Sequence, residues 1–350
     1  MSDPEPGSEP HTDLELDGSD GGGQLLRTAL TLAALTGQGF EMTGVRGSRP
    51  EPGLRPQHLA CVEAVAGLTD AAVAGGAVGS ETLGFAPTRA PEGDVDVDVG
   101  TAGSVALVFD TVLPFAVAVD APVTVTASGG TDVKWAPTLD FLRRVKLPLL
   151  ARHGLAADVT VERRGFYPVG GGRATLCVAP SSLRPFALET RGTPVASAHA
   201  VAAAALADDV PGRALARLRE RLSVPLTGTT VTRAETDSPG FALLVSVASP
   251  PSGAGSGTRA GFDEVGERGV PAETVADSVV DAVHAWLDGT GVVDAFLADQ
   301  LVVPLALGGG TVEVPRVTPH VRTSLELLEA FDYGLRTRED GERVVLSGPE

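Results

Sequence analysis

The chain has 350 residues, of which 43% are hydrophobic, and a formal net charge of −18. This length and apolar content suffice for one or two folded domains. No apolar run reaches the roughly 18–20 residues of a membrane span, and the acidic, Pro-rich start is unlike a signal peptide. We therefore expect a cytoplasmic protein with no membrane partner, preceded by a disordered acidic leader at residues 1–12.

Arginine carries almost all positive charge, because the chain has only two lysines, Lys134 and Lys146. Such an acidic surface is typical of halophilic proteins, in which dissolved salt screens the repulsion between carboxylates. We expect folding to need roughly molar salt; an ordinary acidic protein is the alternative. Net acidity argues against nucleic acid as a partner, but a cluster of arginines at residues 27–55 permits a local basic cleft.

In chain order, the first half predicts strands and helices that alternate. Residues 14–17 and 39–45 read as strands around a helix at 24–35. The elements that follow are a helix at 57–68, strands at 71–78, 82–87 and 94–99, a helix at 104–115, a strand at 123–128, a helix at 137–153, and paired strands at 159–164 and 173–178. Strands and helices thus recur as modules, unlike a Rossmann series.

The composition changes after residue 181. Residues 182–268 contain Ala-rich, Arg-rich and Ser/Gly-rich stretches, and we interpret them as an inserted, smaller α/β domain with an exposed loop at 250–257. Helical sequence at 273–287 and 299–307, a strand at 311–314 and a last helix at 323–331 follow. The predicted fold class is α+β with α/β repeats, and residues 13–181 and 269–340 form the main domain.

The segment DGSDGGGQLLR, residues 17–27, is a candidate anion site. Three glycines before a helix leave backbone N–H groups and the positive helix end free for a phosphate. Gln24 and Arg27 follow within the first turns of this helix. Asp20 is a candidate ligand for a divalent metal, with a helix cap as the alternative role.

The segment VRGSRPEPGLRPQHL, residues 45–59, is too rich in Pro and Gly for regular structure. It presents Arg46, Arg49 and Gln57 on a rigid loop, and guanidinium groups suit phosphate oxygens; a solvated surface loop is the alternative. His58 is more typical of a structural role. The turn from Gly100 to Ser104 is a further helix-start anion site, with simple packing as the alternative.

Three polar residues near the C-terminus complete the candidate set. Asp299 and Gln300 lie in the apolar stretch ADQLVVPLAL, where they could hold a base or ribose or bridge neighbouring elements. His320 follows Pro319, and we expect it at the mouth of a turn after a strand. A neutral imidazole is a good nucleophile toward phosphorus, and together with the Gly- and Arg-rich segments upstream it makes His320 the candidate catalytic residue; an inert histidine is the alternative.

These segments, in this order, resemble the RNA 3'-terminal phosphate cyclase family, in a haloarchaeal-type form. The resemblance runs from about residue 14 to residue 331 and includes GTAGS, SGGTD and GFYPVGGG. It implies repeated strand-helix modules of the enolpyruvyl transferase and cyclase type, with a smaller inserted α/β domain. It also implies an enzyme that uses ATP and Mg²⁺ or Mn²⁺ to convert an RNA 3'-phosphate into a 2',3'-cyclic phosphate.

The resemblance assigns roles by position. His320 would attack the α-phosphorus and form a histidine-linked AMP, which then passes to the RNA end. Phosphate and RNA contacts fall to Arg27, Arg46, Arg49 and Gln57, and nucleotide contacts to Gln24, Gly100, Ser104, Asp299 and Gln300. Asp20 would replace the usual metal-binding glutamate, in a first loop that is about two residues shorter than in the family.

Two other functions remain as alternatives. Cyclase-like proteins without the nucleophilic histidine serve as ribosome-assembly factors, and His320 argues against that role. An enolpyruvyl transferase acting on a small molecule would need general acid and base motifs that the sequence does not match. RNA 3' ends are the expected partner, and a homodimer remains an alternative to a monomer.

Overall fold

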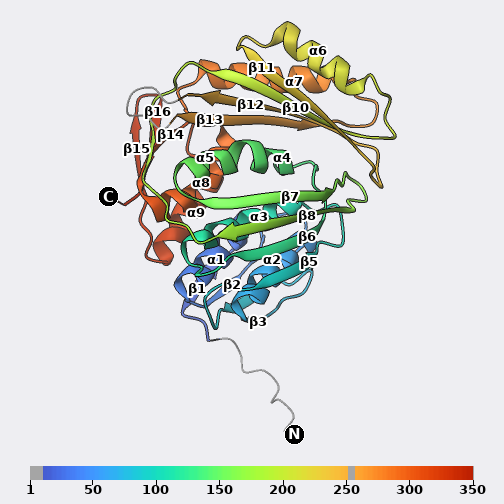
Figure 1. Ribbon diagram of the computed structural model, residues 1–350. Helices are drawn as coiled ribbons and strands as arrows, with labels where there is room; N and C mark the ends of the chain where they lie inside the picture. Colours follow the sequence, from blue (N-terminus) through green and yellow to red (C-terminus); the bar gives the residue numbers. More distant parts are fainter. Residues whose placement is uncertain (1–10, 251–256, 350) are drawn as a thin grey trace.

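The computed structural model describes residues 11–250 and 257–349. The predicted disordered leader therefore falls outside the described residues except for its last two positions, as does most of the predicted loop at 250–257. Within the described part, the strands form four sheets of four strands each (Figure 1). No helix in this part is both long and apolar enough to cross a bilayer.

The first sheet combines two parallel and two antiparallel strands. Its elements in chain order are β1 (Leu14–Asp17), α1 (Gly23–Thr36), β2 (Phe40–Thr43), α2 (Pro56–Thr69), β3 (Ala72–Ala74) and β4 (Leu83–Ala86). The strand order is β1-β2-β4-β3, with β1 parallel to β2 and the other pairs antiparallel.

The second sheet repeats this pattern. Its elements are β5 (Asp94–Asp98), α3 (Val105–Val112), β6 (Val123–Gly129), α4 (Leu139–Phe141), a π-helical segment (Leu142–Lys146), α5 (Leu147–Arg152), β7 (Ala156–Arg163) and β8 (Gly172–Ala179). The order is β5-β6-β8-β7, again with the first pair parallel and the others antiparallel. The predicted helix at 137–153 is thus interrupted by a π-turn.

The third sheet has the same order although its strands are far apart in sequence. Its elements are β9 (Phe186–Leu188), α8 (Ala295–Gly308), β14 (Gly310–Val314), α9 (Pro319–Ala330), β15 (Arg336–Asp340) and β16 (Arg343–Ser347). The parallel pair β9-β14 is followed by antiparallel β16 and β15. One buried hydrophobic cluster extends through the three modules.

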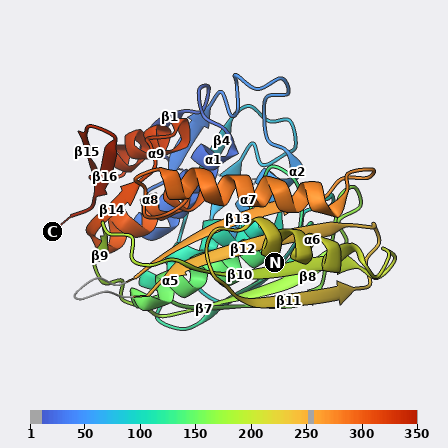
Figure 2. The ribbon, with the colours of Figure 1, turned by 90° about the horizontal axis from the view of Figure 1, so that it is seen from above.

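The fourth sheet lies between β9 and α8 in the chain. Its elements are β10 (Val195–Ala203), α6 (Val210–Arg221), β11 (Leu226–Ala234), β12 (Phe241–Ser249), β13 (Thr258–Val265) and α7 (Ala272–Asp288). Both helices pack on its outer face over a separate apolar cluster (Figures 1 and 2). Strand β9 pairs with β14 of the third sheet, and α7 covers β12 and β13 of the fourth.

The last helix begins earlier than the sequence predicted. Residues 323–331 were expected to be helical, whereas α9 starts at Pro319, after Thr318 as its N-cap. The Thr318 hydroxyl accepts a hydrogen bond from the Val321 backbone N–H at 3.0 Å, and proline fits the first helical position because it lacks an N–H. His320 therefore lies in the first turn of a helix and not in the expected turn before it.

Candidate active site

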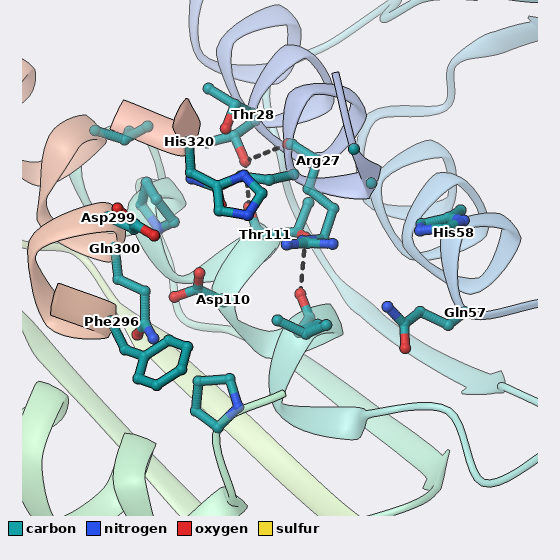
Figure 3. A pocket seen from close by; sticks show the side chains of 18 of the residues that line it. Arg27, Thr28, Gln57, His58, Asp110, Thr111, Phe296, Asp299, Gln300 and His320 are labelled. Atoms are coloured by element: carbon teal, nitrogen blue, oxygen red, sulfur yellow. Dashed lines mark hydrogen bonds between the residues drawn. The ribbon is translucent and has the colours of Figure 1, made fainter. Parts of the chain in front are cut away.

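A cavity of about 280 Å³ opens where the starts of α1, α2 and α9 meet α3 and α8 (Figure 3). Seven residues predicted as site residues line it, although they lie up to about 300 positions apart in the chain: Gln24, Arg27, Arg49, Gln57, Asp299, Gln300 and His320. Four others do not line it: Asp20, Arg46, Gly100 and Ser104. The fold thus joins both ends of the chain at one cavity.

His320 is held by the cap of its helix. The Thr318 hydroxyl donates to Asp299 Oδ1 at 2.5 Å while it caps α9, so α8 and the first turn of α9 are fixed to each other. Figure 3 shows the imidazole directed into the cavity, with Arg27 on one side and Asp299 on the other. Within the described residues the ring forms no hydrogen bond, so its nitrogens are available to a ligand.

A second contact joins α9 to the glycine-rich start of α1. Gln24 Nε2 donates to the Ser324 hydroxyl at 3.4 Å, across 300 residues of sequence. Ser324 is one turn beyond His320 on the same helix. The imidazole and the first turn of α1 therefore have a fixed relative position.

Gly22 and Gly23 leave the start of α1 open. A Cβ on Gly22 would lie 2.9 Å from Arg49 Nη2, and a Cβ on Gly23 would collide with the His58 ring. The N-cap position is Gly22, which has no side chain to bond the free N–H groups, so Asp20 is not the helix cap. The first N–H groups of α1 thus face the cavity beside an arginine, which suits an anion.

His58 has the structural role that its sequence position suggested. The ring is buried, and its Nδ1 accepts a hydrogen bond from the Arg55 backbone N–H at 3.1 Å, which satisfies that donor at the start of α2. Burial, followed by the charge of Arg27 and of Arg46, lowers the pKa of His58 to about 3. The ring is therefore neutral at physiological pH and adds no charge to the site.

Arg27 carries positive charge into the cavity. Burial lowers its pKa from the ordinary value, and nearby Cys61 and Asp110 oppose this shift. Among the described residues its guanidinium forms no ion pair within 4 Å, although Asp110 lines the same cavity. Its N–H donors are therefore free to bind phosphate oxygens, to which guanidinium groups bond in a bidentate manner.

The remaining predicted residues have other positions. Arg46 donates from Nη1 to the Glu51 and Gly53 carbonyls at 2.8 Å each, so it stabilises its own loop. Ser104 is the buried N-cap residue of α3, and its N–H donates to Gln57 Oε1 at 3.1 Å. Gly100 is exposed at a separate hollow.

Asp20 is exposed at the start of the loop before α1. In residues 11–250 and 257–349, no three His, Cys, Asp or Glu side chains gather as a set of metal ligands. A divalent metal at this site would therefore depend on phosphate oxygens for most of its ligands, as Mg²⁺ commonly does.

Sequence reasoning missed several residues of the cavity, among them two charged and two aromatic side chains. Asp110 and Lys146 form an ion pair in its wall, and Lys146 is buried. Trp135 and Phe296 are exposed aromatic side chains that also line it. The sequence signal that could have found two of them is the rarity of their residue types. The chain has only two lysines and two tryptophans, and one of each lines this cavity.

Comparisons with known proteins show that the chain matches one protein family over most of its length. The family model described as RNA 3'-terminal phosphate cyclase matches residues 19–333. A protein of Halobacterium salinarum named RNA 3'-terminal phosphate cyclase is 47% identical over 345 residues, covering 95% of this chain and 99% of that protein. Proteins of the same name from Ectopseudomonas mendocina and Pyrobaculum aerophilum are 42% and 36% identical, each covering 91% of this chain and 92% of the relative.

These matches extend over most of the chain and include every segment that lines the cavity. The fold contains three strand-helix modules of one strand order, and a histidine and two arginines line one cavity between them. The chain belongs to the RNA 3'-terminal phosphate cyclase family.

Proposed function

We propose that this protein converts an RNA 3'-terminal phosphate into a 2',3'-cyclic phosphate, with ATP and a divalent metal. One observation carries the proposal: the His320 imidazole shares a cavity with the open N-terminus of α1 and with Arg27 and Arg49. The cyclase names of the relatives support the same activity. The cavity offers what phosphoryl chemistry requires, namely a nucleophile and fixed positive groups.

In the first step, a ring nitrogen of His320 attacks the α-phosphorus of ATP. An N–P bond forms, the bond to the β-phosphate oxygen breaks, and pyrophosphate leaves. The N–H groups at the start of α1 would bind phosphate oxygens, with Arg27 and Arg49 neutralising the negative charge. The Thr318–Asp299 contact holds the helix that carries the nucleophile, so little reorganisation is needed for attack.

In the later steps, the RNA 3'-phosphate attacks the phosphorus on His320 and releases the imidazole. The 2'-hydroxyl of the same nucleotide then attacks the activated 3'-phosphate, closes the ring and expels AMP. Gln57 is half-buried in the cavity wall and could orient this end of the RNA. A bound divalent metal would neutralise phosphate charge during transfer, and Asp20 is its proposed protein ligand.

The base of the nucleotide would contact α8. Phe296 is exposed at the cavity, one turn before Asp299 and Gln300, and presents a ring on which a base can stack. The amide of Gln300 can donate and accept hydrogen bonds, and Gln24 lies near the phosphate end of the cavity. Gly100 and Ser104 lie outside the cavity, so we assign Ser104 the support of Gln57 in place of direct nucleotide contact.

The proposal also covers the kinship of the fold, the location of the protein and its partners. Three sheets of one strand order support the enolpyruvyl transferase-type kinship, and the fourth sheet with α6 and α7 is the proposed inserted domain. A cytoplasmic location, an RNA partner and ATP as the nucleotide are parts of the same proposal. The alternative, a non-catalytic assembly factor, needs no free imidazole at an anion site.

Incubation of the purified protein with α-labelled ATP and Mg²⁺ or Mn²⁺ tests this proposal. We expect labelled protein that loses its label on addition of RNA with a 3'-phosphate, together with a cyclic RNA product. His320→Ala should abolish labelling, whereas His11→Ala, at an exposed histidine outside the cavity, should not. Absence of label in the wild type would favour the assembly factor, whereas equal labelling in His320→Ala would show that His320 is not the nucleophile.

A further inference from the structure

Trp135 lies at the mouth of the cavity, in the loop between β6 and α4. Its side chain is 96% exposed, although it lines the cavity that contains His320. The chain has only one other tryptophan, Trp286, which is 7% exposed in the apolar cluster under α7. One of the two tryptophans in this protein therefore contributes nothing to a hydrophobic core.

The backbone at Trp135 is also unfavourable. Its φ of 61° lies in the left-handed region, which bulky side chains rarely adopt. A residue keeps this strained backbone conformation only when surrounding contacts enforce it, and such residues are concentrated at functional sites. Exposure and backbone strain together indicate that the ring is presented for a ligand.

Contacts on both sides of Trp135 hold the loop in place. Lys134 pairs with Glu267, and the Thr138 backbone N–H donates to Asp263 Oδ2 at 2.7 Å. Both acidic partners lie in or just after β13, so the fourth sheet anchors the loop. The loop that carries Trp135 is thus held at the cavity mouth before any ligand arrives, which lowers the entropy cost of ordering the loop on binding.

The size of the cavity indicates which ligand reaches Trp135. About 280 Å³ lies at the lower limit of small-ligand sites and leaves room for little beyond one nucleotide. The RNA strand that accepts AMP must then cross the mouth of the cavity, where the exposed indole of Trp135 forms part of the rim. An indole face stacks on any base, which suits an enzyme that recognises the phosphorylated end of an RNA and not its sequence.

We propose that Trp135 is a stacking platform for a nucleobase within the last three nucleotides of the RNA substrate. This inference rests on the proposed function and adds a binding subsite to it. Trp135 acts on RNA binding and not on histidine adenylylation. Because the side chain packs against almost nothing, its removal leaves the fold intact.

Two measurements on Trp135→Ala test the subsite. With 3'-phosphorylated RNA, the concentration for half-maximal AMP transfer should rise roughly 5- to 100-fold, as loss of one stacked base implies. Trp135→Phe should lie between this variant and the wild type. Labelling with ATP alone should be unchanged, and Tyr167→Ala, at an exposed aromatic residue outside the cavity, should behave as wild type.

RNA substrates with an abasic nucleotide at one of the last three positions identify the stacked base. With the wild type, one of these substrates should raise the RNA concentration for half-maximal AMP transfer by a similar factor. With Trp135→Ala, the same substrate should raise it no further. Unchanged RNA dependence in Trp135→Ala, or a raised ATP requirement for labelling, would overturn the inference; the latter would assign the indole to ATP. RNA should quench the fluorescence of the exposed tryptophan in the wild type and not in Trp135→Ala. This measurement tests RNA binding at Trp135 even if no histidine adduct forms.

Discussion

Arg164→Met should destabilise the protein strongly, because among the described residues Arg164 is the one cation paired with the buried carboxylate of Asp132, whereas Asp140 keeps Arg143 and Arg144 as partners. The Arg164 side chain is 6% exposed, and its guanidinium lies 3.2 Å from Asp132 Oδ2 and 2.7 Å from Asp140 Oδ2. Both aspartates are buried, and Asp140 also lies 3.4 Å from His199 Nε2 of β10. Breaking a buried ion pair by removing one partner costs about 3–5 kcal/mol, so we expect a loss of that size.

The neighbouring arginine provides a matched control. Arg163 pairs with Asp237, but its side chain is 48% exposed, and such surface pairs contribute about 0–1 kcal/mol. Urea unfolding of both variants at one fixed salt concentration measures the difference in the free energy of unfolding. Losses of about 1 kcal/mol or less in both variants would refute the reasoning.

The pH dependence of the Arg164→Met loss gives a second check. Burial raises the pKa of Asp132 above its usual value even with Arg164 present. Burial acts in the same direction on Asp140, but hydrogen bonding to His199 and the charge of Arg164 lower its pKa. Without Arg164 the Asp132 carboxyl group can neutralise by binding a proton, so the loss should be smaller at pH 5 than at pH 8.

Three further predictions follow from other buried groups. Lys146→Met should cost about 2–3 kcal/mol, less than a fully buried pair because Asp110 is 22% exposed, whereas Lys134→Met should cost under about 1 kcal/mol; thermal or urea unfolding compares the two lysines. Burial raises the pKa of Asp294 to about 7, so the unfolded chain loses this proton at lower pH and stability falls as pH rises from about 4 to 7. Asp294→Asn should reduce that fall, and an unchanged dependence of the urea midpoint on pH would contradict the assignment. Thr318→Val should cost about 1 kcal/mol as a lost cap and should slow histidine labelling at saturating ATP with little change in the ATP requirement. An unchanged labelling rate would show that the Thr318–Asp299 contact does not position His320.

Local sequence determined the elements that carry the site. Apolar periodicity and the glycines at 21–23 located α1 to within one residue at each end. Helix starts and amphipathic faces depend on residues that are close in sequence, so the sequence is enough to predict them. The start of α9 was missed although Thr318 and Pro319 form a normal cap and first turn. Its position decides where His320 points, so a four-residue error mattered more here than elsewhere.

Which side chains share the cavity was decided by the tertiary structure. Arg46 and Arg49 lie in the same loop, and the sequence predicted the same role for both. Arg46 donates hydrogen bonds to carbonyls of its own loop, whereas Arg49 faces the start of α1. The pairing of Lys146 with Asp110 joins a π-turn to α3 and has no local signal.

The sequence by itself determined the alternation of elements and the glycine-rich helix start, because each depends on residues within one or two turns. It also singled out His320 as the nucleophile candidate, but through the order of motifs along the whole chain. Only the tertiary structure brought Gln24 to Ser324 and placed Trp135 at the cavity mouth. Those positions depend on how three sheets and an intervening layer pack, and packing energy is shared among residues that are distant in the chain.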